Sequence, residues 1–472
     1  MSLDLIPDVF ADGVASAVIE ARGYATDTDA SIRFATRHHD HLRFVPGLGW
    51  HVWNGKHWEL DQRHQILELA KESARAWTVD CAKHIVDGRE KAVREALVLE
   101  QAGHIRAMID LAKSDRRLVL PAAELDSDPW LLNVSNGTLD LKSGKLRQHS
   151  RKDLHSRMAP VNYVDGAKHE VLTRFMEAID ASSPGMAAFL ARCFGACLTG
   201  DCSPETLFLL QGPGGCGKTT ITEAMGSMLG DYSVKLPFES FCLCKHGRSP
   251  GAASPDIVRL RGSRLAYASE GDAAARIDAG MVKTLTGGEP ITARGLYSDP
   301  ITFRQTWKLW MVSNYEPRAD SDDSGLWRRM LKVYFSEVPV SKRDPNIKQI
   351  LTEDPAARSA LLFWAVQGCL AWQGAGRGRH GLQAPEAVLE ATATYRSRQD
   401  SLAEWWDAVL CEAELDTGSN VSATEVRKKY DRWCAQNGCR PVSSQRLAKF
   451  LESKGLVPKR TMSNRYWSGI RF

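Results

Sequence analysis

The sequence predicts an α/β core between two smaller modules, and three observations support this prediction. Residues 205–340 alternate apolar strands with helical segments, which is typical of a parallel sheet covered by helices. Inside that stretch, an apolar run leads into a glycine-rich loop and then into a helical pattern. The flanking regions instead combine amphipathic helices with short β patterns. We therefore divide the chain into four parts, 1–165, 166–345, 346–400 and 401–472.

Composition places the chain among ordinary globular proteins. It has 472 residues, 43% of them hydrophobic and 25% charged, and a net charge of +4, so any nucleic-acid surface must be local. No run approaches the roughly 18 apolar residues of a membrane span, and the first residues lack a signal-peptide pattern, so we expect no membrane contact and a cytoplasmic location. Eleven scattered cysteines favour reduced thiols; a zinc site at Cys242, Cys244 and His246 is the weaker alternative.

The remaining local patterns predict elements on both sides of the core. We expect a β-hairpin or small sheet at 42–61, a long helical stretch at 65–111 and a pair of short strands at 131–150. Two helices at 170–200 precede the core. One apolar helix at 355–372 follows it, and then a linker or exposed loop at 374–381.

The most specific pattern is GPGGCGKT, residues 212–219, which fits a phosphate-binding loop at every fixed position. The strand 206–210 precedes it and a helical pattern follows. Glycines let the backbone wrap around phosphate, and N–H groups at the helix start point at the anion. Lys218 would reach the β- and γ-phosphates of ATP, and the Thr219 hydroxyl would bind Mg²⁺. The nucleotide-binding segment that we predict is Gly212, Pro213, Gly214, Gly215, Cys216, Gly217, Lys218, Thr219 and Thr220.

Two later strands end in polar residues that suit nucleotide hydrolysis. Residues 264–269 form a short apolar strand before Glu270, whose carboxylate would hold the metal and polarise water. Asp272 could share the metal. The strand 307–313 ends at Asn314, whose amide would orient water or contact the γ-phosphate. A solvated acid and a turn asparagine are the alternatives.

An arginine pair, Arg328 and Arg329, precedes the strand 331–335. An arginine from a neighbouring subunit would stabilise charge that develops on the γ-phosphate. A solvated pair, or a pair bound to acids, explains the spacing equally well.

The order of these parts resembles superfamily 3 helicases, which are AAA+-type motors, and most closely the phage/plasmid primase family that includes poxvirus-type primase–helicases. The strings that carry the resemblance are LFLLQGPGGCGKTT, RLAYASEGD, VKTLTGGEPITARGLYSDPITFRQTWKLWMVSN and GLWRRMLKVYF. GWHVWNGKHWELD and LNVSNGTLDLKSGKL resemble the helicase-associated domain of that family. The likeness runs from about residue 27 to beyond residue 335.

The resemblance assigns roles by position. Glu270 becomes the acid of the second motif, Asn314 the sensor, and Arg329 the finger arginine, with Arg328 as second choice. Lys283 lies where relatives have a basic residue near the nucleotide between subunits. Ser269 replaces the first of two carboxylates common in relatives, which leaves the part of Asp272 in the metal shell open. The chain begins at the helicase-associated region, so we expect no upstream primase domain and no primer synthesis.

DNA contacts are predicted in two places. Residues 287–300 suggest a β-hairpin, which in the resembling helicases projects into a central channel; Arg294 would contact phosphate and Tyr297 would stack on a base. The alternative pairs Arg294 with Glu289 and buries Tyr297.

The second predicted DNA-binding region is the C-terminus. Residues 421–472 carry twelve basic and three acidic residues, a net of +9, and their order of two helices and a terminal strand resembles a winged helix. Ser443 and Ser444 would cap the second helix. The basic residues that we expect at DNA there are Arg446, Lys449, Lys459 and Arg460. A solvated basic face is the alternative.

Three classes of function follow from these assignments. The leading hypothesis is an ATP- and Mg²⁺-dependent replicative DNA helicase of a phage, plasmid or other mobile element, in a bacterial host cytoplasm. The resemblance implies a hexameric ring that moves 3′ to 5′ on single-stranded or forked DNA, and it leaves open a separate primase or initiator as partner. The alternatives are an ATPase that remodels, loads or packages DNA, and an origin-binding initiator for which ATP is a switch.

Overall fold

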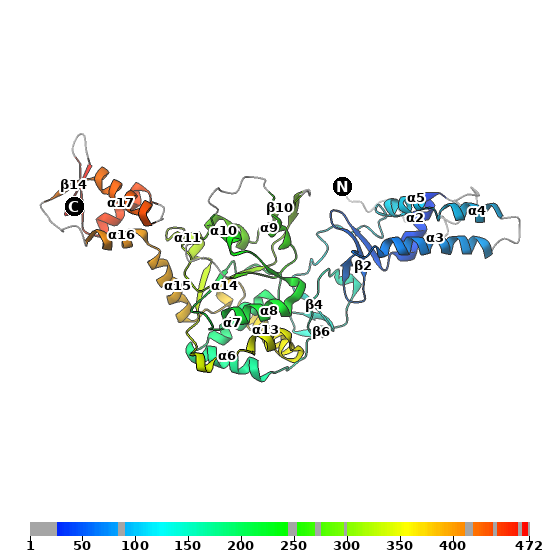
Figure 1. Ribbon diagram of the computed structural model, residues 1–472, viewed down its shortest axis with the longest axis horizontal. Coiled ribbons are helices and arrows are strands. Elements are labelled where there is room, and N and C mark those ends of the chain that lie inside the picture. The colour runs from blue at the N-terminus through cyan, green and yellow to red at the C-terminus, as the bar shows by residue number, and fades with distance from the viewer. Residues whose placement is uncertain are drawn as a thin grey trace.

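The computed structural model describes residues 26–83, 90–243, 253–269, 275–296, 300–410, 419–437, 441–460 and 465–470. The molecule is elongated, with an N-terminal helical module at one end, the central sheet in the middle and the C-terminal module at the other end (Figure 1). The predicted α/β core with smaller flanking modules is therefore the observed arrangement. None of the helices in the described part of the chain is long and apolar enough to cross a membrane.

The N-terminal module combines an antiparallel sheet with helices. The predicted hairpin or small sheet is a three-stranded meander in the order β1-β2-β3, and the long helical pattern is divided into three helices. Its elements are α2 (Asp27–His38), β1 (Leu42–Val45), β2 (Gly49–Trp53), β3 (Trp58–Leu60), α3 (Gln65–Lys83), α4 (Glu90–Val98) and α5 (Ala102–Ala112). Phe34 and Trp77 are buried in a core of their own beneath these helices.

A second antiparallel sheet and two helices connect this module to the central domain. These elements are β4 (Leu131–Val134), β5 (Gly137–Asp140), β6 (Lys145–Arg147), α6 (Glu170–Ser182) and α7 (Met186–Cys197). The tight turn at Ser143-Gly144 joins β5 to β6, and the helix break at 183–185 separates α6 from α7, as predicted. Gly185 has φ +79° directly before α7, a backbone conformation that favours glycine.

The central domain is built on a five-stranded parallel sheet in the order β13-β7-β12-β9-β8. Its strands are β7 (Leu207–Gln211), β8 (Ser233–Lys235), β9 (Leu265–Ser269), β12 (Lys308–Ser313) and β13 (Met330–Tyr334). The helices and hairpin strands between them are α8 (Lys218–Leu229), α9 (Pro255–Arg259), α10 (Ala279–Thr286), β10 (Ile291–Arg294), β11 (Pro300–Phe303) and α11 (Ser324–Trp327). The fourth strand of the sheet along the chain, β12, therefore lies between the first and the third.

Both faces of this sheet are buried, because successive residues of each strand point to opposite sides. Phe208 and Trp310 lie on one face, under α7 and α8, whereas Leu207 and Leu309 belong to the core on the other face. Trp310 stacks between Phe194 and Phe208, with ring centroids 4.1 and 4.3 Å apart. The nearly continuous apolar composition of the strands follows from this double burial.

After the sheet come α12 (Ile347–Glu353), α13 (Pro355–Gly374), α14 (Gly378–Gly381) and α15 (Glu386–Arg398). The apolar helix expected at 355–372 is α13. The expected linker at 374–381 is different: its second half forms α14, Gly381 is buried, and the Arg379 guanidinium donates to the Met330 carbonyl at 2.8 Å. Packing against the sheet edge therefore orders a segment whose glycines and arginines suggested an exposed loop.

Helices α7 and α13 approach each other closely where both carry glycine. A Cβ on Gly368 would lie 1.9 Å from the Ala191 carbonyl oxygen, and one on Gly195 would lie 2.2 Å from the Cys369 nitrogen. We expect Gly368→Ala to force the helices apart and to cost about 1–3 kcal/mol of unfolding free energy. Chemical denaturation measures this cost. Gly374→Ala, at the end of the same helix and with no atom within 4 Å of the added Cβ, is the control; equal stability of the two variants would contradict the packing argument.

The C-terminal module contains the two predicted helices and a three-stranded antiparallel sheet in the order β14-β16-β15. Its elements are α16 (Ser401–Leu410), β14 (Asn420–Ser422), α17 (Ala423–Asn437), α18 (Ser444–Ser453), β15 (Val457–Arg460) and β16 (Arg465–Ser468). The Ser443 side chain accepts a hydrogen bond from the Arg446 nitrogen and so caps α18, as expected. The single terminal strand that we expected is instead a hairpin, with Lys459 opposite Tyr466.

Candidate nucleotide site

The loop 212–217 lies at the carboxyl end of β7 and passes directly into α8, whose first residue is Lys218. Two glycines make this path possible. A Cβ on Gly212 would lie 2.2 Å from the Phe335 carbonyl oxygen, and Gly217 has φ +95° and a ring atom of Phe175 2.8 Å from its ideal Cβ position. The loop therefore follows a path that side chains at these positions would block.

Lys218 is buried in the middle of this loop, 4% exposed. Its ammonium donates to the carbonyl oxygens of Gly212 and Pro213, each at 2.7 Å, and to the Asn314 side-chain oxygen at 3.1 Å. The Cys216 sulfur lies 3.3 Å from the same nitrogen. Lys218 and Asn314, which are 96 residues apart in the chain, therefore meet at one point.

The strand order explains this meeting. Because β12 is the neighbour of β7, Ser313 is in register with Gln211, and Asn314 emerges beside the start of the loop. The Gln211 side-chain amide donates to the Asn314 carbonyl at 3.1 Å and holds the backbone at that position. Gln211 is a site residue that its sequence context does not reveal, since a glutamine at a strand end has no recognisable pattern.

The start of α8 offers further donors. Gly217 is the N-cap of α8 and has no side chain to accept a hydrogen bond from the helix start. The backbone N–H groups of the first turn, at Lys218, Thr219 and Thr220, therefore point toward the loop without a side-chain acceptor at the N-cap. Thr219 and Thr220 are half-buried. Glu270 and Asp272 lie outside the described residues, but Ser269 is in register with Val312, so β9 ends at the same edge of the sheet as β12.

One further arginine lies at the loop. An ideal Cβ on Gly215 would be 2.7 Å from an Arg343 guanidinium nitrogen, so this side chain borders the loop 212–217. The Arg343 Nε donates to the Val338 carbonyl at 2.9 Å, which fixes the side chain near its own backbone. Arg343 follows the loop by more than 120 residues without a motif around it, so only the structure identifies it.

The arginine pair lies at the opposite edge of the sheet. Met330 is opposite Leu207 in the register of β13 and β7, whereas Gln211, next to the loop, is opposite Tyr334. At about 3.3 Å per residue, the two edges are roughly 15–20 Å apart. Neither Arg328 nor Arg329 therefore lies near Lys218 of the same chain.

Burial distinguishes the two arginines. Arg329 is 8% exposed, forms an ion pair with Glu205 at 3.2 Å and donates to the Gly325 carbonyl. Arg328 is exposed. Lys283, on α10, forms an ion pair at 2.8 Å with Asp323, the N-cap of α11. Burial tends to raise the pKa of Asp323, but the hydrogen bond from Lys283 and the helix-start N–H groups lower it on balance.

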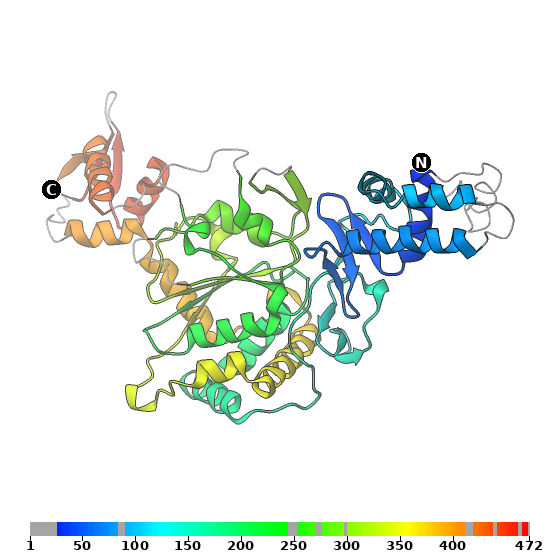
Figure 2. The ribbon, with the colours of Figure 1, turned by 45° about the vertical axis from the view of Figure 1, so that its right-hand side comes forward.

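The predicted hairpin is present as β10 and β11, with Arg294 opposite Pro300 at its end. It extends above the sheet in both views (Figures 1 and 2). Arg294 is exposed, and no side-chain pairing with Glu289 is found among the described residues. Tyr297 lies outside them. Arg294 is thus an exposed arginine at the last paired position of β10.

The four basic residues predicted to contact DNA in the C-terminal module differ in their surroundings. Lys449, Lys459 and Arg460 are exposed, and Lys459 donates to the Asn420 side chain at 3.4 Å. Arg446 is half-buried and forms ion pairs with Asp322 and Asp400. The first three residues are therefore accessible, whereas Arg446 contacts the rest of the protein.

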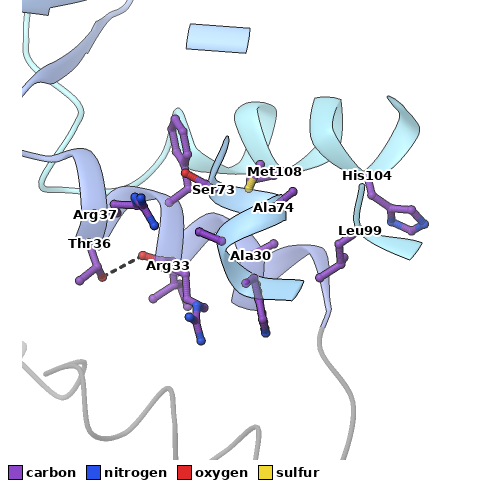
Figure 3. Close-up of a pocket in the computed structure, with 13 residues that line it drawn as sticks. Ala30, Arg33, Thr36, Arg37, Ser73, Ala74, Leu99, His104 and Met108 are labelled. Atoms are coloured by element: carbon purple, nitrogen blue, oxygen red, sulfur yellow. Dashed lines mark hydrogen bonds between the residues drawn. The ribbon is translucent and has the colours of Figure 1, made fainter. Parts of the chain in front are cut away.

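The N-terminal module contains a cavity of about 320 Å³ between α2, α3 and α5, remote from these residues (Figure 3). Its base is apolar and its rim carries Arg33, Arg37 and His104. The Arg33 guanidinium lies 4.5 Å from the centre of the Trp77 ring, and His104 is hydrogen-bonded to Asp27. Some of the polar groups at its rim thus already have partners within the module.

Of the proposed zinc ligands, Cys242 is buried and its thiol donates to the Phe238 carbonyl; Cys244 and His246 lie outside the described residues.

The chain is similar to viral proteins that are named as putative helicases or primases. Residues 31–195 match the family described as D5 N terminal like, and residues 210–329 match a family of unknown function, DUF5906. The first of these regions includes both small sheets, and the second runs from the end of β7 to Arg329. The matches support a relationship to D5-like primase–helicases.

The chain is 28% identical over 328 residues to "Putative helicase L207/L206" of Acanthamoeba polyphaga mimivirus, and 27% identical over 333 residues to "Putative primase C962R" of African swine fever virus. Each match covers 66% of this chain and 34% of the relative, so the chain spans about a third of the length of these relatives. Among solved structures, the apo NrS-1 C-terminal region aligns with a TM-score of 0.49 and 9% identity, over 91% of this chain and 95% of that one.

Proposed function

We propose that the protein is an ATP-driven DNA helicase with an AAA+-type core that acts in the replication of a mobile element or virus. The observation that carries this proposal is the contact between Lys218 and Asn314 at the carboxyl edge of the parallel sheet. A lysine in the loop after β7 and an amide directly after the neighbouring strand β12, with β9 ending at the same edge, suit recognition of a γ-phosphate. The viral relatives and their names support the same role.

Each residue of this site has a part in hydrolysis. The loop glycines and the first turn of α8 bind the phosphates through N–H groups, and Lys218 exchanges its carbonyl contacts for phosphate oxygens. The Thr219 hydroxyl and the Glu270 carboxylate are an oxygen set that suits Mg²⁺, which neutralises phosphate charge when bound. Glu270 also accepts the proton of the attacking water, and Asn314 orients that water.

A ring explains the arginine pair better than a monomer does. Arg328 and Lys283 lie on the side of the sheet away from the loop of their own chain, so they would reach the nucleotide of a neighbouring subunit. Closed cyclic assemblies place one such edge against the next subunit's loop at every interface. We propose a hexamer, with Arg328 as the finger because it is exposed, and Arg329 as the alternative that the family resemblance favours.

Two elements are proposed to bind DNA. The β10–β11 hairpin would carry Arg294, together with Tyr297, into the channel of the ring. In the C-terminal module, the order of helices and strands and the sheet order β14-β16-β15 support a winged-helix-like domain, in which α18 would lie in the major groove. Lys449, Lys459 and Arg460 would then contact phosphates.

Strand displacement on forked DNA tests this proposal. We expect unwinding that requires ATP, Mg²⁺ and a 3′ tail, because superfamily 3 helicases move 3′ to 5′. The control substrate carries only a 5′ tail. DNA-stimulated hydrolysis without displacement would favour a remodelling, loading or packaging ATPase. Sequence-specific binding that survives Lys218→Ala, again without displacement, would favour an origin-binding initiator. Unwinding that requires a 5′ tail would contradict the family assignment itself.

A further inference from the structure

The C-terminal module contacts the central domain through α18, the helix assigned to DNA. The Arg446 guanidinium, in the first turn of α18, forms an ion pair with Asp322, which lies two residues before α11, and is 3.7 Å from an Asp400 oxygen. Arg318 adds a hydrogen bond of 2.5 Å to the Asn437 carbonyl at the end of α17. We call the contacts of Arg446 with Asp322 and Asp400 the inter-domain ion pair.

The segments that carry Asp322 and Asp400 are held by hydrogen bonds that do not involve Arg446. Asp322 belongs to the loop 314–323, which is hydrogen-bonded to the end of α15. The Gln399 side-chain oxygen accepts a hydrogen bond from the Ala319 nitrogen at 2.9 Å, and the Arg396 Nε donates to the Ser321 carbonyl at 3.1 Å. Asp400 lies between α15 and α16, directly before Ser401, and its side chain accepts a hydrogen bond from the Leu402 nitrogen at the start of α16. The acids are therefore positioned independently of Arg446.

The interface around this ion pair is polar and incompletely packed. A cavity of about 460 Å³ lies between the domains, and its walls include Arg276, Asp320, Glu404 and Ser443. Separation of the domains would thus expose little apolar surface, and the charged contacts would set its cost. In Figure 1, α11 lies on the side of the core that faces α16 and α17.

These observations lead to one conclusion about regulation. We propose that the inter-domain ion pair masks α18: Asp322 and Asp400 occupy Arg446 as DNA phosphates would, and DNA must displace them. The proposal rests on the assignment of α18 to DNA. The same loop begins at Asn314, which contacts Lys218, so the acids that hold α18 and the sensor of the nucleotide site share one segment. Lys449, exposed on the same helix, stays available for the first encounter with DNA.

The contact itself is tested without DNA. In the full-length variant Arg446→Lys, a carbodiimide should couple the new amine to Asp322 or Asp400, and mass spectrometry should identify the linked peptides. Adding duplex DNA should lower the yield. The same reaction on Lys449→Arg, which keeps Arg446, provides the background. A yield from Arg446→Lys no higher than this background would overturn the proposal.

DNA affinity tests the consequence. The double variant Asp322→Asn/Asp400→Asn should bind duplex DNA at least about threefold more tightly at low salt, with a slope of log K against log[salt] steeper by about 0.9, because one more phosphate contact forms. Asn at 400 keeps the side-chain oxygen that caps α16. Glu404→Gln is the control for charge, since Glu404 borders the same cavity and is exposed. Adding Arg446→Ala should remove the gain, whereas Lys449→Ala should weaken binding in both backgrounds.

The outcomes separate the two levels of the proposal. An equal gain in affinity and slope from Glu404→Gln would overturn the masking by Asp322 and Asp400 and leave the DNA assignment in place. A specific crosslink together with no DNA binding by any variant would overturn the assignment of α18 to DNA, and the masking with it. A gain that Arg446→Ala removes supports both.

Discussion

Replacing Lys218 by alanine is expected to reduce ATP hydrolysis by about 100-fold or more, which is the scale for loss of a positioned charge in an active site. The ammonium lies at the centre of the loop 212–217, where it contacts Gly212, Pro213 and Asn314. No other lysine is found in the described loop and first helical turn to take its place. Loss of this charge should therefore affect both phosphate binding and the hydrolytic step.

The fold should survive this substitution, because the partners of Lys218 are mostly loop carbonyls rather than side chains of the hydrophobic core. Phosphate release measures hydrolysis, and thermal unfolding measures the fold. Lys235→Ala is the matched control, since Lys235 is a half-exposed lysine that forms an ion pair with Glu223 away from the loop. Hydrolysis by Lys218→Ala at the wild-type rate, with an unchanged melting temperature, would rule out the assignment.

The parts of this site that could be predicted from sequence are those set by local chemistry. The segment 212–219 can be recognised from sequence because the glycines, lysine and threonine of a phosphate-binding loop lie close together in the chain. In the structure, α8 begins at Lys218, as this pattern predicts. The hairpin at 291–303 follows from alternating residues around a turn, and the cap at Ser443 follows from a single side chain. In each case the interacting residues are only a few positions apart.

The parts that could not be predicted depend on contacts between distant segments. Nothing in β12 itself indicates that it inserts between β7 and β9, yet this order brings Asn314 to Lys218. Gln211 and Arg343 border the site through the same long-range packing. Arg446 shows the opposite effect: its place on a basic helix predicts a free cation, whereas two acids remote in sequence form ion pairs with it.

The arginine pair gives the second large expected effect, a loss of hydrolysis that a different inactive subunit reverses. Arg328→Ala should abolish most of the activity and leave the melting temperature unchanged, because the side chain is exposed. Arg329→Ala should instead lower the melting temperature, since it leaves Glu205 without its partner at the amino edge of the sheet. Comparison of the two variants separates a role in hydrolysis from a role in the fold.

Mixing Arg328→Ala subunits with Lys218→Ala subunits tests whether the arginine acts across an interface. Each variant alone should be nearly inactive. In an equal mixture that assembles at random into a closed ring, about a quarter of the interfaces would combine an intact Lys218 with an intact Arg328 from the neighbour. The rate of hydrolysis should therefore recover to about a quarter of the wild-type rate. An arginine that acted within its own chain could not be rescued, because every subunit would lack one of the two groups. Rings that form in the mixture and remain inactive would exclude Arg328 as the finger, and recovery with Arg329→Ala in its place would move the role to the buried arginine.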